Sequence, residues 1–171
     1  MTIRTSIFFF LISFSAFSQQ DIDTKSIGRK ILKGTVKPSD NDSTFRVLDS
    51  LFCNNPAEKD FYFKVANKIQ NMSDGALGEF FSGIASKYYL DYNMEFIRNS
   101  SKLTAVEIEG WLNQACYDIA ATEQSIDSLP KIKKRLDNLV TNCSCSDNQK
   151  NLIKKYNNFI YSCVDNGIRN P

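Results

Sequence analysis

Histidine is missing from this sequence, and its absence limits the chemistry the remaining residues can perform. Histidine is the commonest general base near neutral pH and the commonest metal ligand in proteins. Ser-His-Asp and Cys-His catalysis, mixed cysteine–histidine zinc sites and histidine-ligated haem are therefore excluded. The residues left to examine are cysteines, carboxylates and aromatic side chains.

Five cysteines occur in the sequence, at Cys53, Cys116, Cys143, Cys145 and Cys163. In an exported chain they can form lasting disulfides, and an odd number leaves at least one unpaired or intermolecular. If the last two helices form a straight hairpin, Cys163 should lie about 24 Å from the turn that holds Cys145, at 1.5 Å per residue. A disulfide needs Cα atoms within about 7 Å of each other. We therefore predict one bridge, from Cys116 to Cys143 or to Cys145.

The segment Cys143-Ser144-Cys145 differs from known cysteine motifs that carry chemistry. It is not the Cys-x-x-Cys of thiol oxidoreductases, and no histidine follows it as in c-type haem attachment. A zinc site of four cysteines needs reduced thiolates, which export does not guarantee. The sequence thus predicts a structural role for the cysteines and predicts no metal and no cofactor.

Carboxylates are the remaining candidates for acid–base catalysis. Glu79 follows Asp74 by five positions, and Glu107 and Glu109 begin the expected helix that carries Trp111. A helical cell-wall glycoside hydrolase can work with one glutamate of raised pKa and a second carboxylate. However, Glu107 is explained by a capping box, and Glu79 can be an ordinary solvated helix residue. We predict no enzymatic activity and keep the hydrolase as an alternative.

Aromatic residues cluster in segment 88–96, across an expected turn between two helices. A turn normally faces water, and tyrosine is enriched in the hot spots of protein interfaces. Tyr89, Tyr92 and Phe96 are therefore the candidate binding residues. The alternative is that these rings close one end of the core with only their hydroxyls exposed. The basic segment 131–135 is interpreted as the solvated face of a helix, with an acidic partner or anionic glycan as its alternative role.

The elements that position these residues are predicted to be helical. From Ser43 onward, apolar residues return at steps of three and four, glycine is scarce, and no strand-like alternation occurs. We expect an all-α fold of about seven short amphipathic helices. Their arrangement should be stacked helical hairpins, as a short α-solenoid-like array, or alternatively a compact irregular bundle.

The last two long helices resemble each other in sequence, since Ile132-Lys133-Lys134 recurs as Ile153-Lys154-Lys155. A helix and turn of about 20 residues is half of a hairpin repeat, such as those of HEAT or tetratricopeptide arrays. Any two lysine-rich amphipathic helices also look alike. The resemblance to solenoids is therefore architectural only.

The amino-terminal residues 1–18 predict a signal peptide. Arg4 is followed by an apolar run and by the small-x-small cleavage site Ala16-Phe17-Ser18. The run is shorter than the roughly 20 residues that cross a bilayer, so no membrane span is expected after cleavage. Residues 19–42 are expected to form a loose polar lead, with at most one short helix. Residues 43–171 are expected to form a single helical domain.

These features together predict an exported protein, periplasmic or secreted and bacterial in style, that binds another protein without catalysing a reaction. The whole chain carries a formal net charge of +2. Removal of Arg4 with the signal leaves about +1, which is too weak to attract nucleic acid. A periplasmic immunity-type inhibitor of a toxin or hydrolase is a more specific alternative, and the glycoside hydrolase is an alternative of another class.

Overall fold

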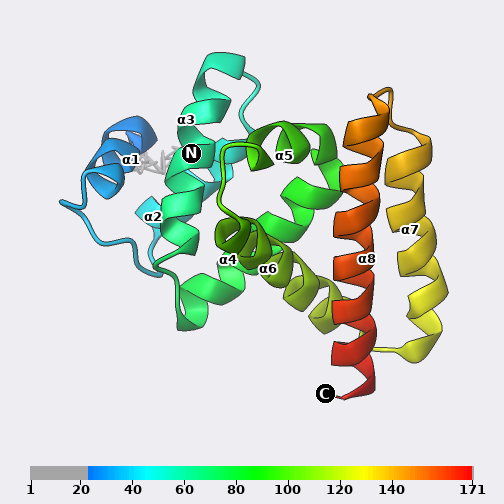
Figure 1. Cartoon of the computed structure of the whole chain (residues 1–171). Helices are drawn as coiled ribbons and strands as arrows, with labels where there is room; N and C mark the ends of the chain where they lie inside the picture. Colours follow the sequence, from blue (N-terminus) through cyan, green and yellow to red (C-terminus); the bar gives the residue numbers. More distant parts are fainter. Residues whose placement is uncertain (1–22, 171) are drawn as a thin grey trace, which may run out of the picture.

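The computed structural model of this protein describes residues 23–170 (Figure 1). Eight α-helices, two short 3-10 helices and no strand make up the described residues, which confirms the predicted all-α fold. The predicted signal peptide lies outside them. The helices are α1 (Thr24–Leu32), α2 (Asp42–Asp49), η1 (Ser50–Phe52), α3 (Pro56–Gln70), α4 (Gly75–Asp91), α5 (Asn93–Ser100), α6 (Ala105–Glu123), η2 (Ile126–Ser128), α7 (Leu129–Thr141) and α8 (Asp147–Arg169).

Local sequence signals set the starts of the two longest helices. Thr104 and Glu107 form a capping box at the start of α6, and Ser146 and Gln149 form another at the start of α8. In each box both side chains accept backbone N–H groups that have no partner inside the helix. Helix α6 therefore begins at the capping box that the sequence indicated for Glu107, and α8 begins at a box of the same kind.

Residues 24–32 form α1, which corresponds to the one short helix allowed for in the otherwise loose lead. Ile31 is fully buried, and the Thr24 hydroxyl lies 2.8 Å from the Tyr62 hydroxyl on α3. Gly28 sits where a Cβ would press against α3, 3.0 Å from the ring of Phe61. This close packing holds the short helix in place. The sequence of the segment gives little indication of the packing, because the segment contains few apolar residues.

Helices α4 and α6 lie side by side and run in the same direction. Ser82 and Ser86 on α4 donate hydrogen bonds to Gln114 and Asp118 on α6, and both pairs are separated by 32 residues. A constant separation between two helices means that the chain advances along both in the same sense. A polar ladder therefore joins these two helices along one edge.

Helix α8 also runs parallel to α6. Cys163 is bridged to Cys116, 47 residues earlier. At the same separation, a Cβ on Gly167 would lie 3.4 Å from that of Ala120. Helix α7 is antiparallel to α8 at one end of the molecule, where the two form a hairpin (Figure 1). The stacking of hairpins into an array stays a prediction.

The core is built around Trp111 on α6. Phe63 from α3 stacks on it at 5.4 Å between ring centroids, and Phe81 from α4 meets it edge-on at 4.9 Å. Tyr88 and Phe96 lie 5.9 and 6.0 Å away. All five rings are buried, so apolar burial joins α3 to α6 into one body.

Helix length and hydropathy within residues 23–170 bear on the membrane prediction. None of the helices there combines the length and the apolar character that a bilayer crossing requires.

Candidate functional site

The predicted binding rings lie mostly inside the protein. Tyr89 and Phe96 are each 1% exposed, so the expectation that they are displayed is wrong, while Tyr92 is half-buried. Helix α4 ends at Asp91 and α5 begins at Asn93. Because the connection is the single residue Tyr92, Tyr89 and Phe96 are carried on helices that pack on the core and are not presented by a loop.

Tyr89 forms a buried polar junction instead of an exposed contact. Its hydroxyl donates to Oδ1 of Asn157 at 2.7 Å, and the Asn157 amide donates to the carbonyl oxygen of Leu136 at 2.6 Å. Burial raises the pKa of Tyr89 above its ordinary value, and it raises the pKa of the neighbouring Tyr88 to about 12. The junction fixes α4, α7 and α8 relative to one another.

The disulfide pairing differs from the prediction. Cys116 pairs with Cys163, with Cα atoms 6.1 Å apart, and Cys143 pairs with Cys145. The predicted bridge from Cys116 to Cys143 or Cys145 is therefore wrong. The reason is that α8 runs alongside α6 in the same direction, which brings the later part of α8 to Cys116. Cys53 is the free cysteine of the described chain.

Among the predicted carboxylates, Glu107 is engaged in its capping box. The Glu107 carboxylate accepts the Thr104 backbone N–H at 2.8 Å and the Asn67 amide at 2.7 Å, and these hydrogen bonds lower its pKa. A general acid in a glycoside hydrolase needs the opposite shift, so Glu107 does not fit that role. Glu79 is exposed on α4. Within residues 23–170, no three acidic or cysteine side chains are grouped as metal ligands.

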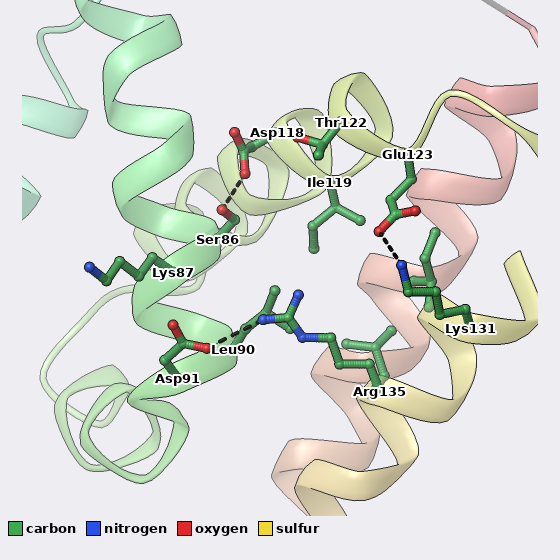
Figure 2. A pocket seen from close by; sticks show the side chains of 12 residues that line it. Ser86, Lys87, Leu90, Asp91, Asp118, Ile119, Thr122, Glu123, Lys131 and Arg135 are labelled. Carbon is green, nitrogen blue, oxygen red and sulfur yellow. Dashed lines mark hydrogen bonds and ion pairs between the residues drawn. The ribbon is translucent and has the colours of Figure 1, made fainter. Parts of the chain in front are cut away.

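A cleft of about 250 Å³ lies where α4, α6 and α7 meet (Figure 2). Leu90, Ile119 and Ile132 give it an apolar floor, and charged side chains from all three helices surround that floor. Figure 2 shows Ile119 and Leu90 pointing toward the space between the helices. An apolar floor with a charged rim is suited to an amphipathic ligand.

Two ion pairs cross the rim of this cleft (Figure 2). Arg135 on α7 lies 3.3 Å from Asp91 on α4, and Lys131 on α7 lies 3.6 Å from Glu123 at the end of α6. The side chains of Arg135 and Lys131 are 57% and 79% exposed. Exposed pairs of this kind contribute about 0–1 kcal/mol. They can therefore exchange their partner for another carboxylate at little cost to stability.

A second groove continues the cleft beyond the Asp91–Arg135 pair, between α7 and the corner of α4 and α5. The two hollows share Leu90, Asp91 and Arg135 in their walls. In the second groove, Asn93 is 8% exposed, and its Oδ1 has no hydrogen-bond partner within residues 23–170. We call the two hollows together the α7 groove, which runs from Lys131 at one end to Cys143 at the other.

The basic side chains of the protein are concentrated on the hairpin that forms one wall of this groove. Residues 129–169 contain eight lysines and arginines and three acidic residues, whereas residues 23–128 contain twelve and fifteen. The small net charge of the whole chain hides this asymmetry. The asymmetry is visible when the charges of each predicted segment are counted separately. Such a count favours Lys131 and Arg135 over the aromatic turn as candidate binding residues.

The comparisons with known proteins add no relative to this description. No family model, no curated protein and no solved structure matches the chain.

Proposed function

We propose that this chain is an exported, non-enzymatic protein-interaction module of the cell envelope, and that an acidic segment of its partner docks in the α7 groove. The observation that carries this proposal is the basic wall of α7 above an apolar floor, held by ion pairs that are open to solvent. The Cys116–Cys163 disulfide supports export, because disulfides persist in oxidising compartments.

The spacing of the basic side chains defines the partner. Lys131 and Arg135 are one helical turn apart, about 6 Å along the axis of α7. A partner helix with acidic residues four positions apart matches this spacing, and an apolar residue between them would lie over Leu90 and Ile119. The partner's carboxylates would replace Asp91 and Glu123 in the two ion pairs. Complementary charge of this kind guides association and sets the register.

The acidic residues in the same rim disfavour a nucleic-acid partner. Asp91, Asp118 and Glu123 line the cleft together with the basic side chains. A phosphate backbone presents closely spaced negative charges, which these three carboxylates would repel. A protein helix that carries only two acids meets less of this repulsion than a phosphate backbone does.

A designed peptide tests the proposal directly. We would measure binding of a helical peptide with a Glu-x-x-Leu-Glu face by fluorescence anisotropy, against a peptide in which both glutamates are glutamine. The glutamate peptide should bind, and Lys131→Glu with Arg135→Glu should weaken it by about tenfold or more, the loss of roughly 1.4 kcal/mol. Circular dichroism would verify that the variant is folded.

The matched control reverses two other charges on the same helix. Lys133→Glu with Lys134→Glu makes the same change in net charge outside the α7 groove. This control should keep the affinity of the native chain. Equal weakening by both double variants would mean non-specific attraction, and binding of the glutamine peptide with equal affinity would also refute the proposal. Growth rescue against a toxin expressed in the same cell would identify an immunity-type inhibitor among such modules.

A further inference from the structure

Three sulfur atoms gather at the turn between α7 and α8. Cys143 is bridged to Cys145, and its Sγ lies 3.1 Å from Sδ of Met94 at the start of α5. Met94 and Cys143 are 49 residues apart in the sequence. Both line the outer end of the α7 groove. Folding therefore places the thioether of Met94 beside the Cys-x-Cys pair, a proximity that the sequence alone does not indicate.

This cluster is more open to solvent than the other disulfide, in which Cys116 is buried and Cys163 is half-buried. The Met94 side chain is 39% exposed, and both Cys143 and Cys145 are half-buried. Cys116, in the other bridge, is 3% exposed. A methionine that only fills space is normally buried among apolar side chains. Met94 is therefore partly exposed where its sulfur atom meets Cys143.

The bridge between Cys143 and Cys145 contributes little to holding the fold. A disulfide stabilises the fold mainly by restricting the conformations of the unfolded chain, and the effect is smaller for a shorter loop. This bridge closes a loop of three residues. The start of α8 has its own capping box at Ser146, and further along the hairpin Asn157 donates a hydrogen bond to α7. The pair is therefore free to serve another purpose.

The reduced pair has the properties of a soft metal site. A dithiol reductant supplies two electrons and two protons, which convert the Cys143–Cys145 disulfide into two thiols while the reductant becomes a disulfide. Cys145 directly precedes Ser146, the N-cap of α8. The positive end of that helix favours a thiolate at this position.

We propose that Cys143, Cys145 and Met94 bind Cu(I) in the reduced chain, and that the disulfide is the closed form of this site. Two thiolates and one thioether are ligands that favour Cu(I). Binding releases the two thiol protons and leaves the oxidation state of copper unchanged. A structural zinc site requires four ligands, so the three sulfur atoms favour Cu(I) over Zn²⁺.

The test is a Cu(I) titration of the full chain after reduction and removal of the reductant under anaerobic conditions. Bathocuproine disulfonate serves as the competing chelator. We expect one Cu(I) per chain and a first shell of sulfur alone in X-ray absorption. Met94→Leu, which keeps the size and apolar character of the side chain, should weaken binding by at least about tenfold, since loss of even an outer-shell partner costs that much. Cys143→Ser and Cys145→Ser should abolish it.

The other cysteines provide the controls. Cys53→Ser should bind Cu(I) as the native chain does, and so should the Cys116→Ser, Cys163→Ser double variant if circular dichroism shows that it is folded. Native affinity in Met94→Leu would overturn the three-sulfur site. So would Cu(I) binding that survives in Cys143→Ser with Cys145→Ser, or failure of the reduced native chain to compete with the chelator.

Discussion

The hydroxyl of Tyr89 on α4 donates a 2.7 Å hydrogen bond to Oδ1 of Asn157 on α8, across 68 residues of sequence. The amide of the same asparagine donates to the Leu136 carbonyl oxygen on α7. Tyr89 and Asn157 are 1% and 5% exposed. One buried side chain thus joins α4, α7 and α8, and α4 and α7 are two of the helices that line the α7 groove.

Asn157→Leu should therefore lower the free energy of unfolding. The substitution leaves the Tyr89 hydroxyl buried without a partner, which costs about 1–3 kcal/mol. Urea denaturation followed by circular dichroism measures the change. The control is Asn158→Leu at the exposed neighbouring position, where a change within about 0.5 kcal/mol is expected. Equal effects of the two variants would contradict the buried junction.

The starts of α6 and α8 can be recognised in the sequence because their signals are local. The capping residues Thr104 and Ser146 mark helix starts within four residues of chain. The burial of Tyr89 depends instead on Asn157, a partner in a distant helix. No local pattern indicates that Tyr92 alone connects α4 to α5, or that Tyr89 and Phe96 on either side of it lie in the core.

The cysteine pairing depends on the relative directions of the helices, and no local sequence pattern indicates these directions. The pairing of Cys116 with Cys163 follows from the parallel course of α6 and α8. The prediction considered only distances along a straight hairpin of the last two helices. It correctly excluded a bridge from Cys163 to Cys145 but gave the wrong partner for Cys116. The approach of Met94 to Cys143 is likewise a product of tertiary packing.

Stability should fall in alkaline solution because of the buried tyrosines. The pKa of Tyr88 is raised from 10.0 to about 12, chiefly by desolvation, and that of Tyr89 is raised as well. A pKa that is higher in the folded state gives a contribution to the free energy of unfolding that is complete below about pH 10. This contribution is lost as the pH rises toward 12, because the unfolded chain releases the proton first. Each such group should remove about 1.4 kcal/mol per pH unit in this window.

Urea midpoints at intervals between pH 8 and pH 12 measure this loss. Tyr88→Phe should flatten the decline, because one of the two groups no longer titrates. Tyr117→Phe is the control, since the Tyr117 side chain is 58% exposed. An alkaline decline that is the same in Tyr88→Phe and in the native chain would contradict the assignment.

The two disulfides should differ widely in their effect on stability. Replacing Cys116 and Cys163 by serine opens a loop spanning 47 residues, and the loss should be about 4 kcal/mol. Replacing Cys143 and Cys145 opens a loop of three residues and should cost less than about 2 kcal/mol. Guanidinium denaturation of both double variants gives the comparison. A larger loss at Cys143 and Cys145 would assign that bridge a structural role and count against a redox-open metal site.

Two glycine substitutions should change stability in opposite directions. In Gly28→Ala the new Cβ would lie 3.0 Å from the Phe61 ring and 3.2 Å from Val65. Overpacking of this kind costs about 1–3 kcal/mol, which exceeds the gain of about 1 kcal/mol from replacing a helical glycine by alanine. In Gly78→Ala, no described atom lies within 4 Å of the Cβ, so the gain of about 0.5–1 kcal/mol should remain. Thermal melts of the two variants compare α1 with α4 directly. If Gly28→Ala also raised the melting temperature, residues 24–32 would not be packed on α3, and the loose lead expected from the sequence would describe them better.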